Sequence, residues 1–251
     1  MEYKEGYVYQ KKIPHYGMLG VYDEKDEGEW VRLLLVDNVR ESAIFLDPEK
    51  RNQAYFHYTQ RLAAVFDGRE DIKSVLLLGG AGFTYPRIFL ARYPEKSMEV
   101  VEMMPFMEKI ARDYFFLEDD PRLTIHISEA MRFLEEHDMV FDAVINDAFI
   151  ADRMDKGLQG EIGVALVKQH LRPGGLYVTN LLTEMFGSAS LPGKLFRERL
   201  SKVFENTLLI RTREDVSVLE RQNFLLLASD ADLELYAKRA YQLSTKNTFD
   251  E

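Results

Sequence analysis

Cysteine is absent from the 251 residues of the sequence. Its absence excludes disulfide bonds, thiolate metal ligands and cysteine nucleophiles, and it is compatible with the cytoplasm, where we expect the protein to act. Long apolar runs are also missing. None approaches the roughly 20 residues that cross a bilayer, and the charged opening at residues 1–5 lacks the apolar core of a secretory signal. We therefore expect no membrane partner.

Basic residues are in deficit, with 32 Lys and Arg against 42 Asp and Glu and a formal net charge of -10. Proteins that bind nucleic acid usually present a basic face, so this balance disfavours a nucleic-acid partner. The five histidines show no metal-ligand spacing with nearby acids, and we predict no metal site. The remaining composition, 46% hydrophobic and 29% charged, is typical of a globular protein that can bury a sizeable core.

The most informative stretch of the sequence lies at residues 74–87. An unbroken apolar run at residues 75–78 predicts a strand buried on both faces, as in a parallel sheet. Thr84 as an N-cap and Pro86 in the first turn predict the start of a helix. Between them lies a glycine turn that permits a sharp bend and the close approach of a ligand, with glycines at Gly79, Gly80 and Gly82. This arrangement is typical of a nucleoside-binding corner, although a glycine turn also serves as a plain tight connection.

Strands and helices alternate from Ile72 onward, which predicts an α/β fold with a Rossmann-like doubly wound sheet. The last two predicted strands, at residues 207–211 and 223–228, have no helix between them and should form an antiparallel hairpin at the sheet edge. Residues 1–50 instead alternate polar and apolar residues between turn signals, which predicts a small antiparallel β-meander lobe. We therefore divide the chain into this lobe and an α/β domain at residues 51–251.

Carboxylates follow three predicted strands of the α/β domain. Glu102 ends the strand after the glycine turn, at the distance where an acid binds a ribose, while Glu129 and Asp147 follow the next two strands. Ligands of open α/β sheets bind at the carboxyl ends of the strands, so we expect these three side chains to converge. Tyr85 replaces the third glycine of the dinucleotide fingerprint, which disfavours an NAD-linked oxidoreductase. Three acids suit a nucleoside with a positive centre, such as a sulfonium.

Six short motifs occur in a familiar order. They are Tyr-Thr-Gln-Arg-Leu at 58–62, Leu-Leu-Leu-Gly-Gly-Ala-Gly at 76–82, Val-Glu-Met-Met-Pro at 101–105, Ser-Glu-Ala at 128–130, Asp-Ala-Val-Ile-Asn-Asp-Ala-Phe at 142–149 and Leu-Arg-Pro-Gly-Gly at 171–175. With these motifs nearly the whole chain resembles the class I S-adenosylmethionine-dependent methyltransferase superfamily. Within it, the chain is most similar to the spermidine synthase (polyamine aminopropyltransferase) family. The resemblance implies the fold predicted above.

The resemblance also implies a set of residues that bind the sulfonium nucleoside. Glu102 looks like the acid that grips the ribose hydroxyls, and Met103 lies where a side chain contacts the adenine. Glu129 occupies the position of an acid, usually Asp, that reads the adenine amino group, and Ala130 that of a small residue beside it. Gln60 resembles a further contact to the cofactor.

A second set of residues is implied for the acceptor. Asp147 occupies the position of the catalytic aspartate that deprotonates or orients the attacking amine, and Tyr58 resembles a tyrosine that hydrogen-bonds this amine. The residues alone leave other interpretations open, with Tyr58 as a core aromatic and Asp147 as a turn or cap residue. Asp152 is the nearest following acid and completes the predicted catalytic set.

The chain departs from the family pattern at two places. An acid normally found within the glycine turn is replaced by Gly82 followed by Phe83, and the acid expected soon after Asp147 is delayed until Asp152. A diamine needs an anion at each end, because burying an unpaired ammonium is costly. These departures leave both aminopropyl and methyl transfer open, and with them the alternative of a catalytically degenerate nucleoside-binding or scaffolding protein.

The sequence thus predicts a transferase that uses S-adenosylmethionine or decarboxylated S-adenosylmethionine as a substrate. It would move an aminopropyl or methyl group to a small-molecule amine whose identity the sequence does not determine. The predicted lobe at residues 1–50 has free strand edges, which favour pairing with a second copy, and relatives of this kind commonly form dimers. We therefore expect a homodimer.

Overall fold

Two β-sheets organise the chain, and the computed structural model describes residues 3–150 and 153–238. The first sheet, called the N-terminal sheet below, is antiparallel with its strands in sequence order. Its strands are β1 (Gly6–Ile13), β2 (Gly17–Asp26), β3 (Glu29–Val36) and β4 (Val39–Phe45). The meander predicted from the sequence is therefore present. Its first strand, with an exposed Tyr-Val pair and two lysines, carries no apolar run that would have predicted it.

The second sheet has seven strands in the order β12-β13-β11-β8-β5-β6-β7. The strands are β5 (Ser74–Leu78), β6 (Ser97–Glu102), β7 (Leu123–Ile127), β8 (Phe141–Asn146), β11 (Leu171–Thr183), β12 (Asn206–Arg211) and β13 (Gln222–Ser229). The strands β11, β8, β5, β6 and β7 pair in parallel, each with the next in this order. Strand β13 pairs antiparallel with both β11 and β12. The predicted doubly wound sheet with a C-terminal antiparallel hairpin is confirmed.

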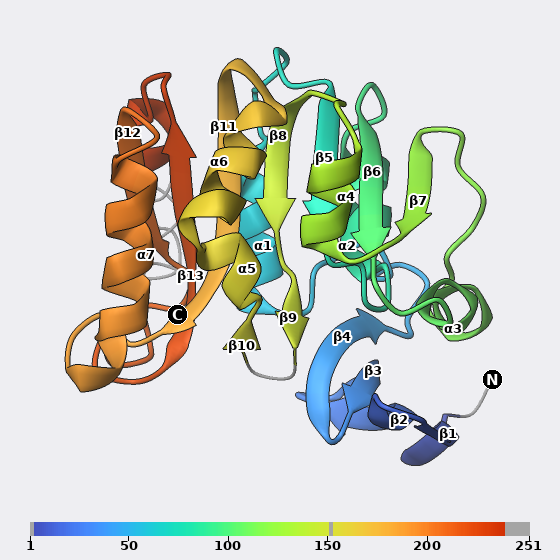
Figure 1. The fold of residues 1–251 in the computed structure, drawn as a ribbon. Coiled ribbons are helices and arrows are strands. Elements are labelled where there is room, and N and C mark those ends of the chain that lie inside the picture. Colours follow the sequence, from blue (N-terminus) through green and yellow to red (C-terminus); the bar gives the residue numbers. More distant parts are fainter. Residues whose placement is uncertain (1–2, 151–152, 239–251) are drawn as a thin grey trace.

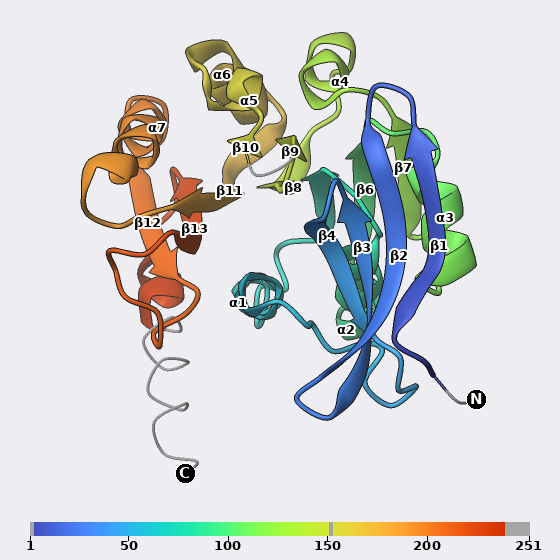
Figure 2. The same cartoon turned by 90° about the horizontal axis from the view of Figure 1, so that it is seen from below.

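Helices cover both faces of the seven-stranded sheet (Figures 1 and 2). One face carries α1 (His57–Val65), α2 (Thr84–Arg92) and α3 (Met107–Tyr114), and the other carries α4 (Ala130–Glu136), α6 (Glu161–Gln169) and α7 (Leu191–Ser201). The central strand β5 shows why its apolar run is unbroken. Val75 and Leu77 enter the core on the first face, while Leu76 and Leu78 enter the core on the second.

Short elements fill the connections after β8 and β11. They are β9 (Phe149–Ile150), β10 (Arg153–Met154), the single-turn α5 (Lys156–Gln159) and the 3-10 turn η1 (Ser188–Ser190). Two predicted helix starts shift. The sequence between residues 52 and 66, with apolar and aromatic residues at helical spacing, predicts a helix there, and the structure starts this helix, α1, only at His57, after an extended Phe56. Thr84 is the first helical residue of α2 rather than its N-cap, because Phe83 precedes it in the left-handed conformation.

The N-terminal sheet lies beyond the carboxyl ends of the parallel strands (Figure 1). Leu19, Leu34 and Ile44 from this sheet belong to the same hydrophobic core as α1, α2 and β5. A buried Arg32–Asp23 ion pair strengthens the attachment, since Arg32 also donates to the carbonyl of Tyr114 at the end of α3. This packing places one strand of the N-terminal sheet beside the nucleoside corner predicted from the sequence.

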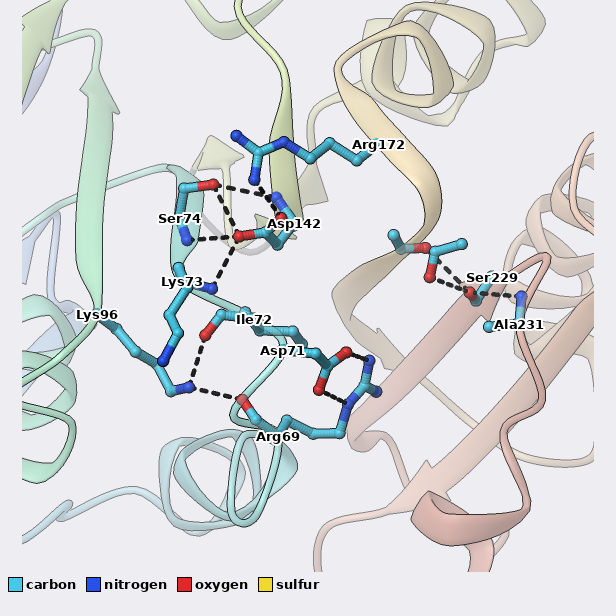
Figure 3. Close-up of polar contacts among 12 residues, drawn as sticks. Arg69, Asp71, Ile72, Lys73, Ser74, Lys96, Asp142, Arg172, Ser229 and Ala231 are labelled. Atoms are coloured by element: carbon cyan, nitrogen blue, oxygen red, sulfur yellow. Dashed lines mark hydrogen bonds and ion pairs between the residues drawn. The ribbon is translucent and has the colours of Figure 1, made fainter.

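At the amino ends of the parallel strands, a carboxylate links two neighbouring strands of the large sheet (Figure 3). Asp142, at the start of β8, accepts hydrogen bonds from the backbone amides of Lys73 and Ser74 at 2.8 Å each and forms an ion pair with Arg172. Burial acts to raise its pKa, but these donors outweigh burial and lower the pKa. Asp142 thus ties β5 to β8 far from the carboxyl edge.

Among the described residues, helices of sufficient length and apolar character to span a membrane are absent.

Candidate functional site

A cavity of about 820 Å³ lies at the carboxyl edge of the large sheet. Leu77 of β5 and Asn180 of β11 line it, together with Asp147, which directly follows β8. Further parts of the wall come from the turn between β2 and β3, from β4, from the chain leading into α1 and its first turn, from the glycine turn and the start of α2, and from residues 212–223 at and before the start of β13. The lining is therefore assembled from segments that lie far apart in the sequence.

A second, smaller cavity of about 60 Å³ adjoins the first. Glu102, Glu129 and Asp147 all line it, so the convergence expected of these three acids is present in the structure. The two cavities have wall residues in common, and these mark the boundary between them: Glu41, Gly79, Ala81, Asp147 and Phe149. A free volume of 60 Å³ is comparable with two water molecules. A nucleoside therefore needs side chains there to move, and Met103, Met104 and Met107 in the wall are of the most adaptable type.

Asp147 and Tyr58 form the polar contact at the boundary. The Tyr58 hydroxyl donates to Asp147 Oδ2 at 3.1 Å, and the Asn180 amide donates to Asp147 Oδ1 at 2.8 Å. Asn180 is oriented in turn by Asn223, whose amide donates to Asn180 Oδ1 at 2.9 Å. Burial raises the pKa of Asp147 to about 6, against the opposing effect of its two donors. Asp147 is therefore ionised at neutral pH and still basic enough to accept a proton from an amine.

The position of Tyr58 in the first turn of α1 explains this contact. Burial, followed by the proximity of Asp147, raises the pKa of Tyr58 well above its usual range, so it remains a hydrogen-bond donor. The extended entry of the chain into α1 is held by Gln60, whose amide donates to the carbonyls of Ala54 and Tyr55. Gln60 lines the larger cavity only. Its predicted contact to the cofactor remains a prediction.

Glu102 is 5% exposed and holds the glycine turn in place. Its Oε2 accepts from the amides of Gly80 and Ala81 at 2.9 Å each, and its Oε1 accepts from the amide of Met104 at 2.8 Å. Burial raises the pKa of Glu102, and the amide donors oppose this rise. Oε2 already accepts two hydrogen bonds, so the accepting capacity that the predicted role toward a ribose requires is left on Oε1.

The glycines of the turn make room mainly for other parts of the protein. Gly79 has a φ of +95°, and a Cβ there would lie 2.5 Å from the carbonyl oxygen of Asp147. Gly82 lies against β4, where its amide donates to Ser42 Oγ at 2.9 Å and a Cβ would lie 2.8 Å from Ser42 Cβ. Gly79 and Gly80 line the larger cavity, whereas Gly82 lines neither cavity. The turn therefore fixes Asp147 and β4 relative to the nucleoside corner.

The other residues predicted to bind the nucleoside line the smaller cavity, and their roles remain predictions. Met103, Glu129 and Ala130 all line the smaller cavity together with Glu102. Glu129 is exposed at the N-cap of α4, and its side chain makes no capping hydrogen bond. Asp152 falls outside the described residues. Groups of three or more His, Asp and Glu side chains suited to a metal are absent from the described part of the chain.

Glu41 is a residue of the boundary that sequence reasoning missed. It lies in β4 and lines both cavities. Burial, followed by the nearby carboxylates of Asp147 and Glu102, raises the pKa of Glu41 to about 7. An acid in an alternating strand of the N-terminal sheet gives no sequence signal of such a role, because only the packing of that sheet on the glycine turn brings it there.

Two buried polar atoms in the wall of the larger cavity also escaped the sequence analysis. The Tyr85 hydroxyl and Gln222 Oε1 lack a hydrogen-bond partner among the described residues. Buried polar groups are normally paired, and these two atoms are closed to solvent, so they are exceptions in the packing of the wall and identify no ligand.

No protein-family model matches the chain. In sequence it is similar to a polyamine aminopropyltransferase of Vibrio vulnificus, with 24% identity over 139 residues that cover 54% of this chain and 46% of the relative. It is also similar to an eEF1A lysine and N-terminal methyltransferase homolog of Drosophila melanogaster, with 28% identity over 159 residues, 59% of this chain and 23% of the relative. The matched parts thus span about half, or less, of these relatives.

Solved structures show the same fold over most of the chain. A probable spermidine synthase from Corynebacterium glutamicum superposes with a TM-score of 0.75 at 22% identity, over 92% of this chain and 82% of the other. A spermidine synthase in complex with the transition-state analogue AdoDATO gives a TM-score of 0.69 at 20% identity, over 90% and 74%. Human methyltransferase-like protein 13 in complex with SAH gives 0.58 at 18% identity, over 76% and 92%. The resemblance to spermidine synthases and to the class I methyltransferase fold is confirmed.

The contact between Gly79 and the Asp147 backbone predicts the effect of a Cβ. We expect Gly79→Ala to lower the free energy of unfolding by about 2–4 kcal/mol, because it adds a backbone clash to the cost of a positive φ. Gly28→Ala is a matched control, since Gly28 has a φ of +90° with nothing within 4 Å of the added Cβ. It should cost only about 1 kcal/mol. Urea unfolding of both variants measures the difference, and equal losses would contradict the clash.

The raised pKa of Asp147 predicts a pH-dependent stability penalty. A folded-state pKa of about 6, above the ordinary 3.8, makes the folded protein lose stability as the pH rises from about 4 to 6. Asp147→Asn removes the charge and keeps one oxygen to accept from Asn180, while its amide nitrogen can donate to the Tyr58 hydroxyl in place of the second accepted bond. At pH 7.5 we expect this variant to exceed the wild type by about 2–3 kcal/mol in free energy of unfolding, with the gain vanishing below about pH 4.

The other end of the same strand provides the control. Asp142 has a lowered pKa, so its charge adds stability above its unfolded-state pKa, and this contribution is lost as the pH falls. Asp142→Asn should therefore destabilise the protein at pH 7.5, opposite in sign to Asp147→Asn. Denaturant titrations from pH 3.5 to 8 measure both variants. Destabilisation by Asp147→Asn at pH 7.5 would show that the charge of Asp147 does not lower the stability of the folded protein.

Proposed function

We propose that the protein is a transferase that moves an alkyl group from a sulfonium nucleoside, decarboxylated S-adenosylmethionine or S-adenosylmethionine, to an amine. The observation that carries this proposal is the Asp147–Tyr58 contact at the boundary between the two cavities. The smaller cavity has the acids and the small residue suited to the nucleoside, and the larger cavity has room for an acceptor. The similarity to polyamine aminopropyltransferases and the shared fold support the same reaction class.

The sulfonium makes the donor reactive without help from the protein, so the protein has to position two molecules and remove one proton. The amine nitrogen attacks the carbon bound to the sulfonium, a C–N bond forms, and the C–S bond breaks to release a neutral thioether. The nitrogen needs a free lone pair for this attack, so the ammonium form of the amine first loses a proton, which Asp147 accepts in our proposal. Holding both reactants in line supplies most of the acceleration, and a positioned base contributes about 10²–10⁴-fold.

Each residue around Asp147 has a separate task in this mechanism. The Asn180 amide and the Tyr58 hydroxyl fix both carboxylate oxygens, so the carboxylate faces the boundary in one orientation. Glu102 holds the amides of the glycine turn and keeps the nucleoside corner in shape. The residues present therefore fit a sulfonium nucleoside and an amine.

The charges of the smaller cavity favour aminopropyl over methyl transfer. Its described wall residues include the acids Glu41, Glu102, Glu129, Asp147 and Asp155 and no Lys, Arg or His. The intact donor carries a carboxylate on its amino-acid tail, and these residues offer no cation to pair with it. Decarboxylated S-adenosylmethionine carries only the ammonium, which acids attract. We therefore assign the aminopropyl reaction as the proposed activity.

Binding of methylthioadenosine, the uncharged nucleoside part of the donor, tests the nucleoside site. We expect binding by isothermal titration calorimetry, and Glu129→Ala should weaken it about five- to tenfold through the loss of a hydrogen bond to a carboxylate. Glu135→Ala is the matched control, because Glu135 is an exposed acid on the same helix outside both cavities. If the wild type binds neither methylthioadenosine nor either donor, the proposal of a transferase is wrong.

Turnover with decarboxylated S-adenosylmethionine and a panel of primary amines tests the role of Asp147. For accepted amines, kcat/KM should rise more steeply with pH below about pH 6, where Asp147 is becoming ionised, than above it, where only the deprotonation of the free amine still adds to the rate. Asp147→Asn should lower kcat by about 10²–10⁴-fold and leave methylthioadenosine binding unchanged. Mass spectrometry of the products distinguishes aminopropyl from methyl transfer. An unchanged kcat in this variant would remove Asp147 from the mechanism.

A further inference from the structure

Glu41 is placed at the boundary by a rigid contact between two parts of the chain. Its neighbour Ser42 accepts the amide of Gly82 at 2.9 Å, and the backbone of the glycine turn approaches β4 so closely that a Cβ on Gly82 would clash. Glu41 is the residue of the N-terminal sheet that lines the smaller cavity. The sheet therefore delivers one carboxylate, in a fixed position, to the point where the nucleoside site meets the acceptor site.

The carboxylate of Glu41 is unpaired within the described part of the chain, whereas nearby cations are paired. In the wall of the larger cavity, Arg40 pairs with Glu24, Lys50 with Glu29 and Arg213 with Asp215. Burial and two neighbouring carboxylates oppose the charge of Glu41. A group in this situation gains most from a ligand that brings a positive charge.

The position of Glu41 determines which part of a bound donor it meets. With the nucleoside in the smaller cavity and the acceptor on Asp147 and Tyr58, the sulfonium and its tail lie at the boundary, where Glu41 lines both cavities. The tail of decarboxylated S-adenosylmethionine ends in an ammonium. The tail of S-adenosylmethionine adds a carboxylate, which Glu41 would repel.

We propose that Glu41 is the specificity-determining residue for the donor. Its carboxylate binds the ammonium of the aminopropyl tail and rejects the carboxylate of intact S-adenosylmethionine. This inference rests on the proposed function, and it assigns the selection of the donor to the N-terminal sheet. The glycine turn, where Gly82 and Phe83 carry no charge, positions β4 but supplies no charge to the tail.

Calorimetry with three ligands tests the inference separately from the proposed function. Methylthioadenosine, which lacks the charged tail, reports on the nucleoside site alone, while decarboxylated and intact S-adenosylmethionine report on the tail. Glu41→Gln should weaken binding of the decarboxylated donor about tenfold or more, lower its preference over the intact donor by a similar factor, and leave methylthioadenosine binding unchanged. Glu205→Gln, an exposed acid outside both cavities, should change none of the three affinities.

Glu41→Asp keeps the charge and guards against a folding defect in the first variant. It should retain a preference for the decarboxylated donor together with normal methylthioadenosine binding. If methylthioadenosine binds and the preference between the two donors is the same in the wild type and Glu41→Gln, the assignment of Glu41 is wrong while the proposed function stands. A change in Glu41→Gln confined to the KM of the amine acceptor would overturn it equally. Failure of the wild type to bind methylthioadenosine would instead refute the proposed function.

Discussion

Carboxylates packed together without cations are the constraint on which the candidate site depends. Glu41, Glu102 and Asp147 come from three different strands or strand ends, and each has a raised pKa with burial as the first cause. Burying like charges in one region opposes folding, so the surrounding structure has to hold them there. The glycine turn does this by hydrogen-bonding Glu102, contacting the backbone of Asp147 and docking β4.

Strand β8 shows how completely the surroundings decide the behaviour of an acid. Asp142 is the second residue of the strand and Asp147 directly follows its last, and both aspartates accept several hydrogen bonds. Asp142 has a nearby arginine and lies partly exposed, so its pKa is lowered. Asp147 has only neutral donors and deeper burial, so its pKa is raised to about 6. The carboxylate at one end of the strand therefore stabilises the sheet, and the one at the other end has a raised pKa.

The sequence predicted the large sheet well because its signals are local. The apolar run of β5, the glycines after it and the acid at position 102 all act within about 25 residues of each other. The convergence of Glu102, Glu129 and Asp147 followed from a general rule about the carboxyl ends of parallel strands. Glu41 could not be found in this way. Its role depends on how an antiparallel sheet packs against a turn about 40 residues later, and no periodicity records that contact.

This dependence links recognition to the attachment of the N-terminal sheet. If Glu41 supplies the charge that the glycine turn lacks, the N-terminal sheet has to stay packed on the large sheet for the donor to be bound. Donor binding then depends on the shared hydrophobic core that contains Leu34 and Ile44. A cationic ligand would in turn relieve the repulsion among the three acids. Because a ligand that binds only the folded state stabilises it, the donor would then act as a missing counter-ion of the fold.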